Sequence, residues 1–361
     1  QAGQEAATRP PVTAKEFKSD IKPVWCPGCG DFAVLNAIAK ALAFLQSPRE
    51  QVALITGIGC SSRIAAYTSL YGFHGVHGRA LALAAGLKAA RPDLTVLVAG
   101  GDGDGLSIGG NHFIHACRRN MDLTYIIMDN EVYGMTKGQA SPTSAPDWLH
   151  GKLTPRGTGI RPFRPAALAL TAGATFIARG FTGDPNGLAR ILVEAIQHPG
   201  FALVQALSPC PTFRPEQMEW KHQVRGFAAE TTSDPAIAAQ RIQDDDGMST
   251  GISYRSQYPV FRIGDAGAHS VAGSMGDALR AIEQWERIEE LIGERCEFTP
   301  CGHSYFALDP KELARLERGH PSAQQPAGAM ALVGLWHDVP ESEIDGLLAE
   351  MGDGVANGEV I

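Results

Sequence analysis

Residues 94–113, LTVLVAGGDGDGLSIGGNHF, join a continuous apolar run to a turn rich in glycine and aspartate and then to a segment of helical character. Such a run is typical of a strand buried on both faces, as in a parallel sheet. Glycines let a backbone turn sharply and approach a phosphate closely, and the amides that open the following helix bind anions. The stretch predicts a strand, a phosphate-binding turn and a helix.

Similar apolar runs bounded by glycine recur along the chain and alternate with helical stretches. This alternation is typical of an α/β protein with a doubly wound parallel sheet. In such sheets, ligands bind at the carboxyl ends of the strands. The expected strands are residues 52–56, 94–99, 123–128, 175–178 and 202–206. The expected helices are residues 32–45, 78–90, 108–119 and 185–198.

The chain is expected to divide into an N-terminal arm (1–20), an α/β domain (21–230) and an irregular C-terminal extension (231–361) of unknown role. The connection 134–165 is rich in proline, glycine and serine, and its length suggests a functional loop.

Regular alternation of strands and helices stops after about residue 214. Residues 232–262 are polar, and we expect them to be irregular. Two further helices are expected in the extension, at 278–293 and 342–351. The sequence contains no internal repeat.

Two polar side chains follow neighbouring expected strands. Asp102 lies in the phosphate turn, where an acid favours phosphate only if a metal ion lies between them. Asn130 ends the strand 123–128, so it reaches the same sheet edge. A Gly-Asp-Gly turn with an asparagine 28 residues after the aspartate matches the magnesium–thiamine diphosphate signature, completed by the carbonyl of Val132.

Other phosphate-binding motifs do not fit. The chain has no GxxxxGK[ST] sequence, and its first expected strand is not followed by a dinucleotide-binding GxGxxG. Asp104 and Asp129 lie close to the proposed ligands, and we expect both to order the loops.

Four of the seven cysteines lie where the same sheet edge is expected. Cys26 and Cys29 form a CxxC before a helix, Cys60 follows the strand 52–56, and Cys210 follows the last strand. A CxxC alone suits zinc, a redox dithiol or a cluster. Four thiolates suit tetrahedral zinc or a [4Fe–4S] cluster, and both remain open at this point.

The other cysteines have a different character. Cys117 lies within an expected helix and is interpreted as a small buried hydrophobe. Cys296 and Cys301, with His303, are interpreted as incidental thiols rather than a second metal site. The closely spaced cysteine run of ferredoxin domains is absent, so at most one cluster is expected.

Composition excludes several functional classes. The net charge is −8 and basic residues are not grouped, which disfavours nucleic-acid binding. No apolar run of about 18 residues predicts a membrane span. The N-terminus lacks the apolar segment of a secretion signal, so we expect a cytoplasmic protein.

Six motifs, in this order, resemble the β subunit of the 2-oxoacid:ferredoxin oxidoreductases. They extend over about residues 24–213, with a weaker echo in GISYR at 251–255, whereas residues 263–361 carry no motif of the family. The motifs are CPGCGDF, GIGCSSR, HGRALALAAGLKAARPD, GGDGDGLSIGGNHF, DNEVYGMTKGQASPT and SPCPTF.

The resemblance implies a role for each matching residue. The implied metal ligands are Cys26, Cys29, Cys60 and Cys210 for a [4Fe–4S] cluster, and Asp102, Asn130 and the Val132 carbonyl for Mg²⁺. Implied to lie near the thiamine are Gly59, Cys60, Ser61 and His77, near the diphosphate Gly103 and Asp104, and at the substrate pocket Arg63 and Met135.

The resemblance also implies the chemistry and the partners. Members of this family decarboxylate a 2-oxoacid oxidatively with thiamine diphosphate, transfer the acyl group to coenzyme A and pass electrons through the cluster to ferredoxin. An α subunit supplies the rest of the active site in an αβ or (αβ)₂ assembly, so this chain alone is expected to be inactive.

The substrate within that class depends on Arg63. Its guanidinium can pair with a second carboxylate, which favours 2-oxoglutarate over pyruvate or another 2-oxoacid. A protein acid or a coenzyme phosphate is the other kind of partner for this side chain. Two further alternatives are a non-redox thiamine-dependent lyase with structural zinc, and a non-catalytic scaffold that keeps a vestigial cofactor fold.

Overall fold

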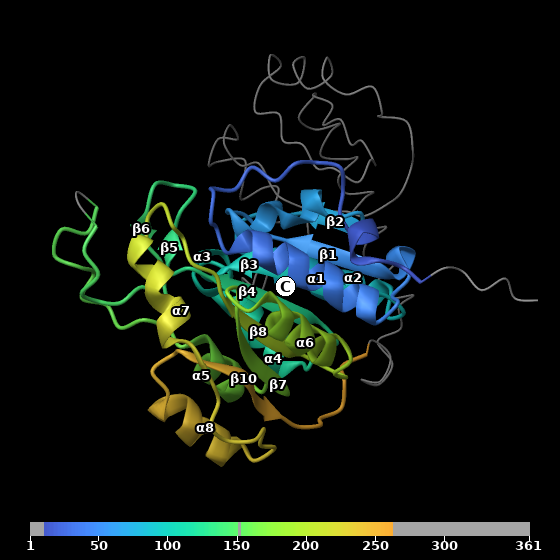
Figure 1. Ribbon diagram of the computed structural model, residues 1–361. Helices are drawn as coiled ribbons and strands as arrows, with labels where there is room; N and C mark the ends of the chain where they lie inside the picture. Colours follow the sequence, from blue (N-terminus) through green and yellow to red (C-terminus); the bar gives the residue numbers. More distant parts are fainter. Residues whose placement is uncertain (1–10, 151–152, 263–361) are drawn as a thin grey trace, which may run out of the picture. The chain divides into compact units, whose positions relative to one another are not determined.

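The computed structural model describes residues 11–150 and 153–262, and its centre is one eight-stranded sheet (Figure 1). The strand order is β2-β1-β3-β4-β8-β7-β10-β9, and every neighbouring pair is parallel except β7 and β10. The strands are β1 (Val52–Thr56), β2 (Tyr71–His74), β3 (Thr95–Gly101), β4 (Thr124–Asp129), β7 (Phe176–Phe181), β8 (Ala202–Leu207), β9 (Arg225–Gly226) and β10 (Ser249–Arg255). A separate antiparallel pair is formed by β5 (Val132–Tyr133) and β6 (Gln139–Ala140).

Helices lie along both faces of the sheet. The α-helices are α1 (Asp31–Phe44), α2 (Ala80–Ala90), α3 (Asp102–Leu106), α4 (Gly110–Arg118), α5 (Pro165–Thr171), α6 (Pro185–Ile196), α7 (Trp220–Gln223) and α8 (Pro235–Asp244). The short 3-10 helices are η1 (Ala14–Phe17), η2 (Arg49–Gln51), η3 (Ser61–Tyr67) and η4 (Pro215–Glu219). None of the helices in the described part of the chain is long and apolar enough to span a membrane.

The central strands are apolar throughout because both of their faces are covered. Every residue of β1, β4 and β8 is buried. Leu97 and Ile126 pack with α1 and α6 on one face, whereas Val98 and Ile127 pack with α2, α4, α5 and α8 on the other. Successive side chains of a strand point to opposite faces, so a continuous apolar run fills two cores.

The expected α/β architecture is therefore confirmed. Each of the five expected strands and four expected helices is present, with ends that differ by at most a few residues. The central strands β1, β3, β4 and β8 are neighbours and parallel, so their carboxyl ends share one edge. The residues that follow these four strands therefore meet there.

The expectation that residues 232–262 are irregular was wrong. α8 begins there after an Asp234 cap, and β10 pairs antiparallel with β7. The strand β10 was missed because its sequence, STGISYR, is polar. A polar strand is stable here because its side chains form hydrogen bonds; Ser253 Oγ donates to the Ile177 carbonyl at 3.1 Å. The edge strand β2 was missed because its residues are largely exposed and carry no apolar run.

Several expectations lie wholly or partly outside the described residues. They are the helices at 278–293 and 342–351, the thiols Cys296 and Cys301, and most of the N-terminal arm. The division of the chain at residue 230 stays a prediction, although β10 on its far side belongs to the same sheet as β1–β8.

A buried ion pair between Arg179 of β7 and Asp245 joins the segment after α8 to the sheet. The N···O distance is 2.5 Å, and the two side chains are 10% and 6% exposed. Asp245→Asn should lower the free energy of unfolding by about 3 kcal/mol, because it leaves a buried guanidinium without its counter-charge. Urea unfolding measures the change.

The neighbouring Asp246 provides the matched control. It is 58% exposed and pairs with Arg225 at the surface, so Asp246→Asn should cost less than about 1 kcal/mol. Equal losses in the free energy of unfolding would contradict the prediction that the buried pair stabilises the fold more than the surface pair.

Candidate functional site

The carboxyl edge of the central strands collects nearly all of the residues singled out by the sequence. The loop after β1 carries Cys60, β3 leads directly into Asp102 at the start of α3, and β4 leads into Asn130. The loop after β8 carries Cys210. Figure 1 shows α3, β5 and β6 beyond the ends of β3 and β4.

Two buried carboxyl groups share one hydroxyl at this edge. Asp102 and Asp129 are 1% and 2% exposed. The Thr143 Oγ1 atom lies 2.7 Å from Asp102 Oδ2 and 2.8 Å from Asp129 Oδ1. A hydroxyl has one proton to donate, so it cannot satisfy both carboxylates at once. The Ser141 hydroxyl adds a hydrogen bond to Asp102.

The negative charge of Asp102 is not fully stabilised by these hydroxyl donors, and its pKa is therefore raised. Burial, and after it the charge of Asp129, raises this pKa to about 8. Burial also raises the pKa of Asp129, although hydrogen bonds from Gln205 and Thr143 oppose the shift. A divalent cation beside Asp102 would stabilise the ionised form that burial disfavours.

The turn after β4 supplies neutral oxygens next to these acids. Asn130 Oδ1 accepts a hydrogen bond from Val132 N at 3.1 Å, and the Val132 carbonyl accepts one from Gly134 N at 3.0 Å. Each oxygen keeps a second lone pair for a metal. A carboxylate, an amide and a carbonyl oxygen form the hard donor set that suits Mg²⁺.

Asp104 of α3 connects the loop after β1 with the loop before α2. Its Oδ1 accepts hydrogen bonds from Ile58 N at 2.9 Å and Gly78 N at 2.7 Å, and it lies 3.0 Å from His77 Nδ1. There is no room for a side chain opposite, because a Cβ at Gly57 would lie 2.0 Å from Asp104 Oδ2. The loops after β1 and before α2 are thereby fastened to α3. Contact of Asp104 with a diphosphate stays a prediction.

Tyr133 covers the phosphate turn. Its hydroxyl donates to the Gly103 carbonyl at 3.3 Å, and its ring occupies the place of a Cβ at Gly103, 2.2 Å from that position. The ring of His77 lies 6.5 Å from that of Tyr133. The turn therefore requires glycine at position 103 because an aromatic ring packs directly on its backbone.

Two of the four predicted cluster cysteines, Cys60 and Cys210, lie together at the adjoining part of the edge. A Cβ placed on Gly134 would lie 3.7 Å from Cys60 Sγ and 3.8 Å from Cys210 Sγ. The charge of Cys26 acts on the pKa of both Cys60 and Cys210, and Cys29 responds to the same two thiols. In residues 11–150 and 153–262, no three His, Cys, Asp or Glu side chains converge on one ion position.

The surroundings of these thiols suit bound metal more than free thiolate. Burial, followed by the charge of Asp31, raises the pKa of Cys60 to about 11 and that of Cys29 further. A metal that replaces the proton removes this penalty. Burial also raises the pKa of Cys210, but nearby backbone N–H groups oppose it and would stabilise a negatively charged sulfur; they belong to Thr212, Phe213 and Arg214.

Cys117 lies elsewhere. It is fully buried in α4 among the apolar residues beneath α2 and α5, which confirms its interpretation as a small hydrophobe.

The remaining predicted residues surround the cysteines. Arg63 lies on η3 with an exposed side chain, and its charge lowers the pKa of Cys60 slightly against the larger effect of burial. Met135 is 44% exposed and follows Gly134. Ser61 is buried, and its Oγ lies 3.1 Å from the Cβ position of Gly101. The contacts of Arg63 and Met135 with substrate, and of Gly59 and Ser61 with thiamine, stay predictions.

Several residues of the site were not singled out by the sequence, among them Ser141, Thr143, Arg214 and Gln217. Ser141 and Thr143 stand within the quoted motif DNEVYGMTKGQASPT, so their hydroxyls in a glycine-rich loop were an available signal. Arg214 and Gln217 gave no such signal, because each contacts the Asn130–Val132 turn across more than 80 residues.

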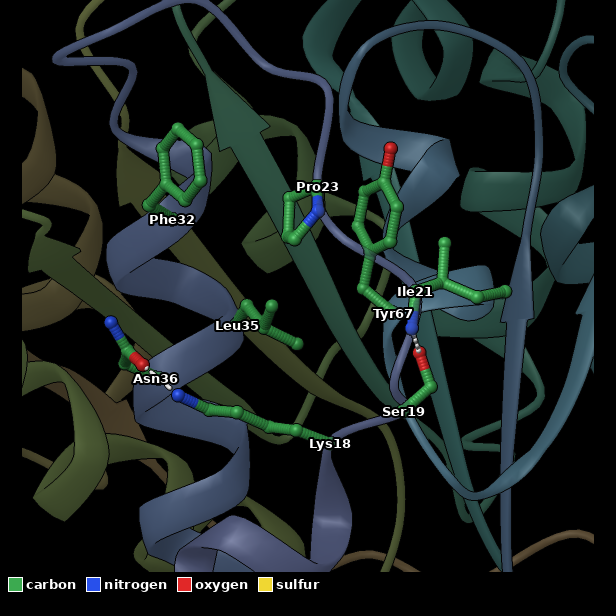
Figure 2. Close-up of a pocket in the computed structure, with 8 residues that line it drawn as sticks. All are labelled: Lys18, Ser19, Ile21, Pro23, Phe32, Leu35, Asn36 and Tyr67. Carbon is green, nitrogen blue, oxygen red and sulfur yellow. Dashed lines mark hydrogen bonds between the residues drawn. The ribbon is translucent and has the colours of Figure 1, made fainter.

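A surface pocket of about 240 Å³ lies between α1, the segment that precedes it and Tyr67 of η3 (Figure 2). The rings of Phe32 and Tyr67 on its wall pack edge-on against Trp25, whose Nε1 donates to the Cys60 carbonyl at 2.7 Å. The pocket is lined by Lys18, Ser19, Ile21, Pro23, Phe32, Leu35, Asn36 and Tyr67, none of which is a predicted ligand.

Comparisons with known proteins support a thiamine diphosphate-binding fold for this chain. Residues 57–206 match the family of the thiamine pyrophosphate enzyme, C-terminal TPP binding domain. The chain is 40% identical over 257 residues to the 2-oxoacid:ferredoxin oxidoreductase 2 subunit beta of Aeropyrum pernix, which covers 67% of this chain and 83% of that protein.

Similarity extends to relatives named for 2-oxoglutarate. Identity is 52% over 206 residues with the 2-oxoglutarate oxidoreductase subunit KorB of Mycobacterium tuberculosis, which covers 57% of this chain and only 55% of that protein. A solved 2-oxoglutarate:ferredoxin oxidoreductase from Magnetococcus marinus, with 2-oxoglutarate, coenzyme A and succinyl-CoA bound, is 36% identical. Its TM-score is 0.67, with 86% of this chain and 97% of that chain covered.

The raised pKa of Asp102 predicts how stability changes with pH in metal-free protein. The folded state holds this proton more tightly than the unfolded state, so the contribution of Asp102 to stability is full below its ordinary pKa of about 4 and is lost as pH rises towards about 8. Urea midpoints measured with EDTA at about pH 5 and about pH 8 should show this loss.

Asp102→Asn removes the titrating group and keeps an oxygen acceptor for the two hydroxyls. The loss between the two pH values should therefore be smaller in this variant than in the wild type. Parallel pH dependence in both proteins would contradict the assignment of this loss to Asp102.

Proposed function

The chain belongs to the β subunits of the 2-oxoacid:ferredoxin oxidoreductases, and on this basis we propose that it carries the thiamine diphosphate and iron–sulfur sites of a 2-oxoglutarate-specific member. One observation carries the proposal: an oxygen donor set lies at the same sheet edge as Cys60 and Cys210, with Cys26 and Cys29 near those two thiols. A lyase without redox chemistry has no use for an electron acceptor beside its thiamine.

The oxygen donors account for the cofactor's metal. Asp102, Asn130 and the Val132 carbonyl would hold Mg²⁺, and the ion would bind the diphosphate. Bound thiamine diphosphate supplies the electron sink that a 2-oxoacid needs to lose CO₂. The chain's own contribution is to hold these oxygens in place through Thr143 and Ser141, and to cover the turn with Tyr133.

The cysteines account for the redox half. The residues that would hold one [4Fe–4S] cluster are Cys26, Cys29, Cys60 and Cys210. The cluster would supply an electron acceptor for oxidation of the substrate. Cys26 is the exposed member of the four, so electrons would leave on its side towards ferredoxin. The acyl group would pass to coenzyme A.

The preference for 2-oxoglutarate is supported by relatives and by one side chain. Several relatives are named for 2-oxoglutarate, and the solved neighbour was obtained with 2-oxoglutarate and succinyl-CoA bound. Arg63 is exposed beside Cys60, and no acid among the described residues pairs with it, so its guanidinium could bind a second carboxylate. The rest of the pocket would come from an α subunit in the cytoplasm, in an αβ or (αβ)₂ assembly.

Co-purification with the α partner tests the proposal. The complex should contain iron, sulfide, magnesium and thiamine diphosphate, and it should reduce a viologen with coenzyme A and 2-oxoglutarate. A colourless complex with zinc in place of iron would overturn the redox function and favour the non-redox lyase.

Cys60→Ser in that complex should abolish the visible absorbance that bleaches on reduction, and viologen reduction should fall to background. The reason is that a serine oxygen is a poor ligand for iron beside three thiolates. Cys117→Ser is the matched control, because Cys117 lies in the apolar core away from the site, and it should keep its iron and sulfide. Retention of the full cluster by Cys60→Ser would count against this ligand set.

Arg63→Ala should raise KM for 2-oxoglutarate by about 10- to 100-fold, the value of one charge-assisted hydrogen-bonded pair. KM for pyruvate should change little, since pyruvate has no second carboxylate. Arg119→Ala, at an exposed position directly after α4, is the control. Equal losses for both substrates would end the idea that Arg63 selects the substrate.

A further inference from the structure

Gln217 is a fully buried side chain whose amide lies between the two predicted cofactor sites. Its Oε1 accepts a hydrogen bond from Cys210 N at 2.9 Å, and its Nε2 donates to the Asn130 carbonyl at 2.8 Å. One partner is a donor and the other an acceptor, so only one orientation of the amide satisfies both. The side chain thus joins the main chain of a predicted cluster ligand to that of a predicted magnesium ligand.

The bridge begins where the sheet ends. β4 and β8 are paired up to Asp129 and Leu207, and Ser208 N still donates to the Asp129 carbonyl at 2.9 Å. The pairing of β4 with β8 ends there, and no ladder hydrogen bond joins Asn130 to the loop that carries Cys210. Gln217, carried by η4, spans this gap.

Arg214 strengthens the same connection. Its Nη1 donates to the Glu131 carbonyl at 2.9 Å, and its Nη2 lies 2.9 Å from a Glu131 carboxylate oxygen. Glu131 has a φ of +53°, a left-handed conformation that a residue other than glycine adopts only when its surroundings hold it. The Arg214 guanidinium also stacks on Trp148 at 4.4 Å. Asn130 and Glu131 are therefore both held through their carbonyls by the segment that follows Cys210.

We propose that Gln217 is a positioning residue that couples the two cofactor sites, so that the cluster and magnesium–thiamine diphosphate each strengthen the binding of the other. The proposal rests on the proposed function. A cluster bound to Cys210 restricts the conformations of its loop. Through the hydrogen bonds of Gln217, Asn130 is restricted as well, so less conformational entropy is lost when the magnesium ligands bind their ion. Such coupling between binding sites is reciprocal.

The test uses the full chain with its α partner, either loaded with the cluster or freed from it by a chelator. Calorimetry measures the Kd of thiamine diphosphate with Mg²⁺ in each form. Removal of the cluster should weaken binding by wild type at least about 5-fold. Gln217→Met keeps the size of the side chain but leaves Cys210 N and the Asn130 carbonyl without a partner, so its two forms should bind with equal, weakened affinity.

Gln240→Met is the matched control, because Gln240 is an exposed glutamine on α8, and its coupling should equal that of wild type. Reciprocity gives a second readout. Thiamine diphosphate should slow iron release to a chelator in wild type but not in Gln217→Met. Circular dichroism checks the fold, and Gln217→Asn, one methylene too short for the bridge, replaces Gln217→Met if the latter does not fold.

Independent binding of the two cofactors in wild type would overturn the proposal, and so would coupling that persists in the Gln217 variants. Both outcomes leave the proposed function intact, since both cofactors still bind. Failure of wild type to bind thiamine diphosphate or iron at all would instead overturn the proposed function, and the coupling with it.

Discussion

Asp102 and Asp129 are two buried acids that share the single hydroxyl proton of Thr143. This constraint organises the site, because two carboxylates cannot both stay ionised at such a position without further compensation. Asp129 receives part of it from Gln205, whose Nε2 donates to Asp129 at 2.7 Å. Among the described residues, Asp102 has only the hydroxyl donors of Ser141 and Thr143, and burial raises its pKa, which makes it the acid whose charge a cation would stabilise.

The support of Asp129 reaches across the sheet. Gln205 on β8 accepts a hydrogen bond from Arg179 on β7, and Arg179 pairs with Asp245 and donates to the Ser249 carbonyl at the start of β10. The late segment of the chain is therefore linked to the acid at the end of β4 by a continuous line of buried polar contacts. Buried polar groups of this kind are stable only when each has a partner, so β10 contributes to the site without touching it.

A second consequence follows from having four parallel strands side by side. Oxygen donors follow β3 and β4, and thiols follow β1 and β8, so one edge presents both hard and soft donors, which suit different metals. Beyond the strands, the loops are no longer held to one another by the ladder of the central sheet. Side chains such as Asp104 and Gln217 take over this function by bonding to the backbone of two loops each.

The sequence by itself determined the parallel sheet and the sheet edge at which the predicted ligand residues lie. It could do so because apolar runs, glycine turns and the residues that follow them are local features. Only the tertiary structure decided that β10 completes the sheet, that Thr143 lies between two acids, and that Gln217 bridges Cys210 and Asn130. These contacts join positions distant in the chain through single polar side chains, and no spacing or periodicity records such pairings.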